Sequence, residues 1–439
     1  MPKLLIHFAR FGPYHLARLR SASEALAPLG WTVKGLQVCS TDSIYDWSPS
    51  QFDDTNGSLN PDIITAFPGA AYEDINAVDI KSTFVKILDR EQPEAITVAG
   101  WSSVDALACC RWAQQRKCKA ILMSETRQLD GRRVWWKEAI KSRRVRRFDA
   151  ALVGGRSHAD YLVKLGMPAE RIGFGYNVVD NDYFANAKVA LGCQSCEHER
   201  NAHPWFLTSN RFVPIKNLNV TLQAYQIYLQ KIASLHHLTT TPTRSSNPSQ
   251  REVNSAVATE SISASVSSEA WNLCLLGDGP LCDSLKTAAS AIGARVRTVL
   301  PWEDDYDLAS QQPTIYFPGF RQIEELPRLY ARAAAFLHPA MSEPWGLVIN
   351  EAMASSLPIL SSRNVGAAEE LVDKKVNGFL FDPASPHEMA DAMSTITQMD
   401  EPQRLIMGQH SLRIINERMP TNAFGKGLAM ILRKTANAR

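Results

Sequence analysis

Short, almost continuously apolar segments alternate with helix-like stretches along most of this chain. In the first part they lie at residues 3–9, 32–38, 95–101, 120–124 and 150–154. Apolar runs of this length, separated by helices, are typical of the strands of a parallel sheet that helices cover on both faces. The sequence therefore predicts an α/β fold with a doubly wound parallel sheet.

The same pattern restarts near residue 205. Apolar segments then lie at 205–208, 272–276, 314–317, 335–338 and 358–360. We predict two Rossmann-like domains facing a central cleft, since ligands of such sheets lie beyond the carboxyl ends of the strands. The predicted divisions are an N-terminal domain at 1–190, a linker at 191–204, a C-terminal domain at 205–420 and a final helix at 421–439.

A segment rich in serine and threonine interrupts the second domain at 239–268. It contains no aromatic residue, and it has too little apolar surface to order itself. We therefore predict a disordered loop without a catalytic role.

The charges of the chain are nearly balanced, with 47 Lys and Arg against 45 Asp and Glu and a formal net charge of +2. This balance gives no overall attraction to nucleic acid, so no nucleic-acid partner is expected. No apolar run reaches the ~18 residues that a membrane-spanning helix needs. The apolar N-terminal run is too short for a signal peptide, so we expect a cytoplasmic chain.

One cluster of potential metal ligands needs separate treatment. Cys193, Cys196, His198 and His203 could together hold a tetrahedral zinc ion. The loop between the cysteine pair and the histidine pair is much shorter than in a zinc finger, however. We favour a polar connector between the domains and expect no metal and no cofactor.

Two glutamates follow the apolar segment at 335–338. Glu343 lies in the next loop, Pro344 and Gly346 prepare a helix start, and Glu351 lies about one turn into that helix. Both carboxylates can reach one ligand across the helix N-terminus, where free N–H groups attract a phosphate. Carboxylates also accept hydrogen bonds from sugar hydroxyls. The alternative is that both glutamates are solvated or cap the helix.

Two cations follow the first strand of the second half. Arg211 and Lys216 lie in the sequence NRFVPIKN, where the ligand edge of that sheet begins. An arginine fork and a lysine point charge would together neutralise a diphosphate. The alternative is that they are ordinary surface cations, but the loop contains no nearby acid.

These motifs together resemble the retaining family-4 glycosyltransferases of the GT-B fold. The resemblance rests on SEPWGLVINEAMA, RFVPIKN, LLGDGP and VGAAEELVDKKVNGFLFDP, which occur in the family's order and spacing across about residues 205–385. It implies that a nucleotide-sugar donor binds the C-terminal domain and that an acceptor binds the N-terminal domain. It also implies that the final helix crosses back to the first domain and that no metal is needed.

The resemblance assigns roles to particular residues. Arg211 and Lys216 would hold the donor diphosphate, Glu343 the sugar hydroxyls and Glu351 the ribose. Phe320 and Arg321 would lie beside the base, and Gly12 would let the N-terminal backbone approach the phosphates. The remaining residues expected to contact the donor are Gly277, Gly279, Gly346, Leu347 and Val348.

The chain departs from the family in its first domain. Such enzymes usually carry a histidine after the fourth N-terminal strand, whereas this chain has Ser124, Glu125 and Arg127 there. Ser124 or Glu125 could hold a sugar or acceptor hydroxyl, and Glu125 could act as a base or charge stabiliser. Alternatively, Glu125 pairs with Arg127 or another arginine. His15 is the other candidate histidine near the cleft, unless it is a surface residue at a helix N-terminus.

Residues 132–147 combine eight cations with one acid, two tryptophans and Ile140. A basic amphipathic segment of this kind suits an anionic membrane surface or an anionic acceptor. The alternative is a solvated helix with its tryptophans packed inward. We expect a peripheral protein on the inner face of a membrane.

The sequence thus predicts a glycosyltransferase that moves a hexose-like sugar from a nucleotide-sugar to a hydroxyl of a glycan or lipid-linked acceptor, with retention. A role in polysaccharide or glycolipid biosynthesis would follow. The alternatives are a GT-B sugar phosphorylase or epimerase, and a catalytically silent nucleotide-sugar-binding protein at the membrane.

Residues 305–307 (DYD) resemble a metal-binding DxD motif, but we expect a solvated turn. An oxidoreductase is disfavoured because no G-x-G-x-x-G follows the first strand.

Overall fold

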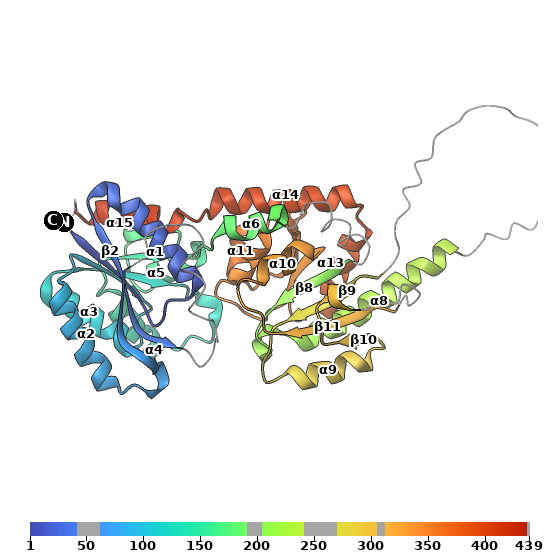
Figure 1. The fold of residues 1–439 in the computed structure, drawn as a ribbon, viewed down its shortest axis with the longest axis horizontal. Coiled ribbons are helices and arrows are strands. Elements are labelled where there is room, and N and C mark those ends of the chain that lie inside the picture. Colours follow the sequence, from blue (N-terminus) through green and yellow to red (C-terminus); the bar gives the residue numbers. More distant parts are fainter. Residues whose placement is uncertain (42–61, 191–203, 241–269, 305–311, 437–439) are drawn as a thin grey trace, which may run out of the picture.

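The computed structural model describes residues 1–41, 62–190, 204–240, 270–304 and 312–436. The chain forms two separate sheets (Figure 1). The first sheet has seven parallel strands in the order β3-β2-β1-β4-β5-β6-β7. These strands are β1 (Lys3–Phe8), β2 (Thr32–Thr41), β3 (Ile63–Ala71), β4 (Ala95–Ala99), β5 (Lys119–Ser124), β6 (Ala150–Val153) and β7 (Ile172–Phe174). In β1, Leu5 pairs with Lys34 of β2 on one side and with Ile96 of β4 on the other.

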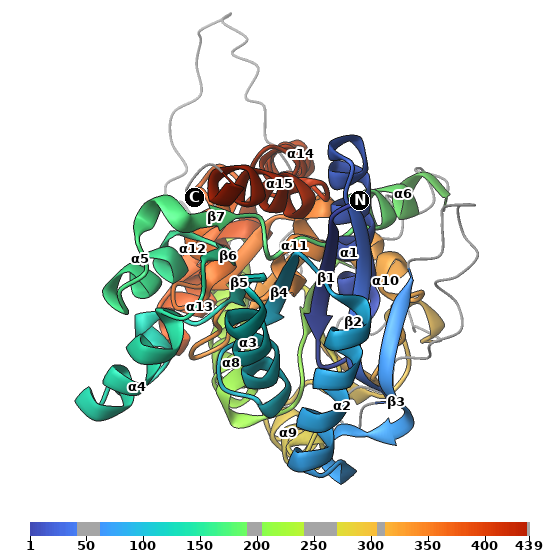
Figure 2. The same cartoon turned by 90° about the vertical axis from the view of Figure 1, so that its left-hand side faces the viewer.

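Helices cover both faces of this sheet (Figure 2). The helices between its strands are α1 (Pro13–Leu26), α2 (Ala77–Glu91), α3 (Val104–Arg116), α4 (Trp135–Val145) and α5 (Arg156–Lys164). Because side chains alternate along a strand, Leu4 and Ile6 pack with Leu19 of α1, whereas Leu5 packs with Phe84 of α2 on the opposite face. Burial on both faces explains why these strands are continuously apolar.

The second sheet also has seven strands, in the order β10-β11-β9-β8-β12-β13-β14. They are β8 (Trp205–Ser209), β9 (Asn272–Leu276), β10 (Arg295–Arg297), β11 (Thr314–Gly319), β12 (Ala335–His338), β13 (Ile359–Ser362) and β14 (Gly378–Phe381). In the described part of the chain, the strands of both sheets pair in parallel. The predicted α/β fold with two doubly wound sheets is confirmed.

The helices of the second domain also form two layers. They are α8 (Leu218–Thr240), α9 (Cys282–Ala291), α10 (Leu326–Arg332), α11 (Leu347–Ala354), α12 (Gly366–Leu371), α13 (Pro386–Gln398) and α14 (Glu401–Arg418). Side chains of α8, α9 and α13 share one core, whereas those of α10, α11 and α14 share another. The latter core continues into the first domain.

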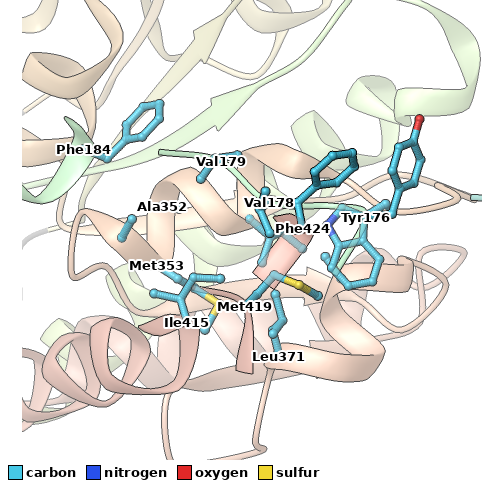
Figure 3. Close-up of a cluster of buried hydrophobic side chains, with 14 of the residues drawn as sticks. Tyr176, Val178, Val179, Phe184, Ala352, Met353, Leu371, Ile415, Met419 and Phe424 are labelled. Atoms are coloured by element: carbon cyan, nitrogen blue, oxygen red, sulfur yellow. The ribbon is translucent and has the colours of Figure 1, made fainter. Parts of the chain in front are cut away.

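Two chain segments cross between the domains. Helix α6 (Asn181–Ala190) lies inside the range predicted for the first domain, but it packs against α10 and α11 of the second. Helix α15 (Ala423–Ala436) follows α14 and packs on α1, β6 and β7 of the first domain. Figure 3 shows the apolar side chains of the crossing, among them Val178, Ile415 and Phe424. The two domains therefore share a continuous apolar core.

Several sequence expectations lie at or beyond the limits of the described residues. Helix α8 continues to Thr240, so the predicted disordered loop begins inside a helix, and residues 241–268 lie outside the described part. Residues 191–203, with the candidate zinc ligands, and residues 305–307 also lie outside it. Within the described ranges, no group of three or more His, Cys, Asp and Glu side chains is placed to hold a metal ion. In the same ranges, none of the helices has the length and apolarity needed to cross a bilayer.

Candidate functional site

A cavity of about 960 Å³ lies between the two domains. The structure brings to it every predicted site residue except Ser124: Gly12, His15, Glu125, Arg211, Lys216, Gly277, Gly279, Phe320, Arg321, Glu343, Gly346, Leu347, Val348 and Glu351. Ser124 is buried at the end of β5, where its hydroxyl accepts the N–H of Thr126 at 3.2 Å. The prediction that Ser124 contacts a substrate is not supported, because its side chain does not line this cavity.

Other residues that line the cavity were not predicted from the sequence. These residues are Arg10, Pro13, Tyr14, Ser209, Asn210, Val213, Leu276, Asp278, Pro280, Leu326 and Trp345. Most of them stand next to a predicted site residue in the sequence, so proximity to a motif could have found them. Leu326 had no such signal, since it comes from the start of α10.

Glycines let the β8–α8 and β9–α9 loops pack directly on each other. Gly277 has a φ of +128°, and a Cβ atom there would lie 1.8 Å from the carbonyl oxygen of Asn210. Gly279 has a φ of +151°, and its Cβ would meet the backbone of Phe212. The N–H of Phe212 donates to the carbonyl of Asp278 at 2.7 Å. The close packing of the two loops therefore requires glycine at both positions.

The β8–α8 loop presents Lys216 to the cavity. Asn217 follows it with a φ of +63°, and its side-chain amide donates to the carbonyls of Pro339 (3.1 Å) and Pro383 (2.7 Å). These bonds hold a backbone conformation that few residues other than glycine adopt. Lys216 forms an ion pair with the carboxylate of Glu343. The exposed Arg211 lines the same side of the site.

Glu343 has a second neighbour behind it. His338, at the end of β12, is fully buried, and its Nε2 lies 3.8 Å from Oε2 of Glu343. Burial, assisted by the positive charge of Lys216, holds the pKa of His338 well below its usual value. His338 is therefore neutral, and Lys216 supplies the positive charge beside Glu343.

Contacts from both domains fix the loop that carries Glu343. A Cβ atom on Gly366 would lie 2.0 Å from the carbonyl oxygen of Pro344, so the two backbones touch. The same carbonyl lies 3.0 Å from Nε2 of His158 in the first domain. Gly346 has a φ of +95° and is the N-cap of α11, as the predicted helix start requires.

Glu351 is neither solvated nor a helix cap, and it is 2% exposed. Oε1 accepts the hydroxyl of Tyr14 at 2.6 Å, and Oε2 accepts that of Tyr330 at 2.7 Å. Burial raises the pKa of Glu351, while the two tyrosine hydrogen bonds act in the opposite direction. The alternative of two solvated or capping glutamates is therefore wrong for Glu351, and equally for the ion-paired Glu343.

Glu125 is the cavity carboxyl from the first domain. Arg127 does not pair with it, since its Nε donates to Asp130 at 3.0 Å and its Nη2 to the carbonyl of Asn364 at 2.8 Å. Burial raises the pKa of Glu125, the nearby charge of Arg18 lowers it, and Glu343 adds to the increase. The alternative that Glu125 pairs with Arg127 is wrong, but another arginine, Arg18, provides the positive charge near this carboxyl.

His15 is part of the fold of the β1–α1 loop. Its Nδ1 accepts the N–H of Gly12 at 3.1 Å, and its ring stacks on Phe8 with the centroids 4.0 Å apart. Burial and the charge of Arg18 lower the pKa of His15 to about 3. His15 does lie at a helix N-terminus, as the alternative had it, but its side chain is half-buried and held by these contacts instead of being free on the surface. His15 is a neutral residue that shapes the cavity wall.

Helix α4 presents its two tryptophans and Ile140 outward, whereas Val145 at its end is buried. Trp135 is 82% exposed, Trp136 47% and Ile140 46%. The one acid of the segment, Glu138, accepts hydrogen bonds from Lys141 and from the hydroxyl of Tyr161, both at 2.8 Å. The alternative with inward-packed tryptophans is wrong. The outer surface therefore combines exposed tryptophans with exposed cations.

Solved structures of low sequence identity share this architecture over the whole chain. The Anabaena protein HepE, in complex with UDP and glucose, has a TM-score of 0.66 at 14% identity, and the match covers 99% of this chain and 100% of that one. Sucrose-phosphate synthase from Thermosynechococcus elongatus has a TM-score of 0.67 at 16% identity, with 100% of both chains covered. These likenesses establish the GT-B fold.

Sequence similarity to a protein family covers part of the second domain. Residues 307–411 match the family described as "Glycosyl transferases group 1". Sucrose-phosphate synthase 4 of Arabidopsis thaliana is 34% identical over 123 residues, and the spinach (Spinacia oleracea) enzyme is 32% identical over 123. Each match covers 27% of this chain and 11% of the relative, so the chain aligns with about a tenth of those proteins. The matched region of this chain includes Glu343 and Glu351.

Proposed function

We propose that this protein is a glycosyltransferase of the retaining family-4 type, which moves a hexose-like sugar from a nucleotide-sugar to a hydroxyl acceptor. One observation carries the proposal. The cavity between the two GT-B domains collects the cations Arg211 and Lys216 with the carboxylates Glu343 and Glu351. The group 1 match across residues 307–411 supports the same activity.

The cations suit a diphosphate. The planar guanidinium of Arg211 can donate two parallel hydrogen bonds to phosphate oxygens. Lys216 has three N–H donors, so it can contact a phosphate while it still binds Glu343. Diphosphate binding would thus keep Glu343 oriented, and its free lone pairs would accept hydrogen bonds from the sugar hydroxyls.

The remaining groups divide between donor and acceptor. Glu351 would accept the ribose hydroxyls, and Phe320 and Arg321 would lie beside the base. Glu125 lies on the acceptor side, and its raised pKa makes it a better proton acceptor than an ordinary glutamate. We assign Glu125 the role of base or charge stabiliser for the acceptor hydroxyl. No metal or cofactor enters this scheme.

The first experiment is a thermal-shift screen with UDP, GDP, ADP and their sugar conjugates. A ligand at ~100 times its dissociation constant adds about 2.7 kcal/mol to the stability, which raises the melting temperature by several degrees. We expect one nucleotide to stabilise the wild type but not Arg211→Ala. Arg433→Ala, at an exposed position of α15 outside the cavity, is the matched control. If no nucleotide stabilises the wild type at millimolar concentration, the donor site is wrongly assigned.

Turnover assays separate this function from its alternatives. A glycosyltransferase consumes the nucleotide-sugar only when an acceptor is present, apart from slow hydrolysis. An epimerase would convert the nucleotide-sugar alone, a phosphorylase would need inorganic phosphate, and a silent binding protein would bind without turnover. NMR of the product's anomeric proton would show whether configuration is retained.

We also propose that α4 docks on an anionic membrane surface, on the cytoplasmic side, where the acceptor is a lipid-linked sugar or glycan. The supporting observation is the outward placement of Trp135 and Trp136 on a helix whose single acid is already paired. Tryptophan side chains insert at the headgroup level, and the cations bind acidic lipids. Pelleting with anionic and neutral vesicles tests this, and equal binding to both would contradict it.

A further inference from the structure

Tyr14 joins the two domains inside the cavity. It lies in the first turn of α1, and its hydroxyl donates to Oε1 of Glu351 on α11 at 2.6 Å. Both residues line the cavity. The hydrogen bond of Arg127 to the carbonyl of Asn364 also joins the domains, but both residues lie outside the lining.

The carboxylate of Glu351, which lines the cavity, can accept more hydrogen bonds than the two tyrosines supply. A carboxylate accepts about four hydrogen bonds, two at each oxygen. Tyr14 takes one position on Oε1, and Tyr330 takes one on Oε2 at 2.7 Å. About two positions remain, one on each oxygen, and a ribose has two adjacent hydroxyls. A nucleotide can therefore bind Glu351 without displacing either tyrosine.

The backbone of the first domain holds Tyr14 in place for this contact. Pro13 precedes it at the start of α1, and the N–H of Gly12 is bound by the ring of His15. The hydroxyl of Tyr14 stays protonated, because burial and the neighbouring Glu351 raise its pKa well above the usual value. Tyr14 thus remains a hydrogen-bond donor to the carboxylate.

We propose that Tyr14 is a positioning residue of the nucleotide site, contributed by the opposite domain. Its hydroxyl orients Glu351 toward the ribose. Because this hydrogen bond spans the two domains, nucleotide binding also favours the arrangement in which the domains are close enough to form it. This inference rests on the proposed nucleotide-sugar site. Tyr330 provides an internal comparison, since it makes the same type of hydrogen bond to the same carboxylate from within the second domain.

Hydrogen exchange of the full chain tests the proposal with Tyr14→Phe and Tyr330→Phe. Each variant removes one hydroxyl from Glu351, but only Tyr14→Phe removes a bond between domains. Without ligand, we expect amide exchange in residues 13–18 of α1 to accelerate on the order of tenfold in Tyr14→Phe and to stay unchanged in Tyr330→Phe, since hydrogen bonds to charged groups are among the stronger ones. Equal exchange in the two variants would overturn the domain bridge.

The second arm adds UDP, GDP and ADP separately. We expect the nucleotide that binds to slow exchange in α11 of all three proteins, but to slow it in residues 13–18 only in the wild type and Tyr330→Phe. Slowing of residues 13–18 in Tyr14→Phe as well would refute the coupling. If no nucleotide slows exchange anywhere in the wild type while the ligand-free difference persists, the proposed nucleotide site fails and the bridge alone stands.

Discussion

Replacing His15 with glutamine should make the protein more resistant to mild acid. His15 packs on Phe8, and its Nδ1 accepts the N–H of Gly12. Burial and the charge of Arg18 lower its pKa from 6.5 to about 3. Glutamine at this third helix position can still accept the Gly12 N–H, as in a capping box, but it cannot take up a proton.

The size of the effect follows from proton counting. Between pH 6.5 and about 3, the unfolded chain binds a proton at His15 and the folded chain does not. The stability contributed by neutral His15 is therefore complete above pH 6.5 and is lost as the pH falls. At pH 5, roughly 1.5 units below 6.5, the loss is about 2 kcal/mol. His15→Gln removes this loss.

The assay is urea unfolding of the wild type and His15→Gln at pH 8 and pH 5. We expect the difference in unfolding free energy between the two proteins to shift by about 2 kcal/mol in favour of His15→Gln at the lower pH. His387→Gln, at an exposed position of α13, is the matched control and should keep the wild-type pH profile. A difference that does not change with pH would show that His15 is not held in its neutral form.

Three further predictions concern the other parts of the site. Glu125→Gln should lower kcat by about 10²- to 10⁴-fold and leave nucleotide affinity unchanged, and steady-state kinetics with near-normal kcat would exclude its role as a base. The double variant Trp135→Ser, Trp136→Ser should lose binding to anionic vesicles at least about tenfold while its melting temperature stays unchanged, and retained pelleting would exclude α4 as the membrane surface. Gly277→Ala should cost about 2–5 kcal/mol in urea unfolding, because its positive φ adds to a Cβ contact of 1.8 Å, whereas Gly30→Ala, with a positive φ in open space, should cost only about 1–2 kcal/mol. Equal losses in the two glycine variants would contradict the packing argument.

The sequence allowed most of the second domain to be predicted, because its signals are local. The strands at 272–276 and 335–338 were predicted with the bounds that the structure shows. By contrast, β3 (Ile63–Ala71) and α2 (Ala77–Glu91) were not predicted. The strand β3 lies at the sheet edge and is only partly buried, so it lacks the continuous apolar run that marked the others.

The candidate site was also largely predicted, because motif spacing is a property of the chain alone. Glu343 and Glu351 flank a helix start, so their approach to one ligand follows from local geometry. Motif spacing did not predict which of two neighbouring side chains would enter the cavity. Ser124 and Glu125 are adjacent, and only the structure shows that Glu125 reaches the cavity.

The sequence by itself determined the alternation of strands and helices for most of the inner strands, the two-domain α/β architecture and the motif residues that meet at the cavity. These features depend on burial patterns and spacings within a few residues. Only the tertiary structure decided which partners those residues have. Tyr14 and Glu351 are 337 positions apart, and Tyr14 carries no sequence signal for this contact. The amphipathic pattern of α4 is equally compatible with tryptophans that face the core and with tryptophans that face outward. The packing of α4 on the rest of the first domain leaves Trp135 exposed.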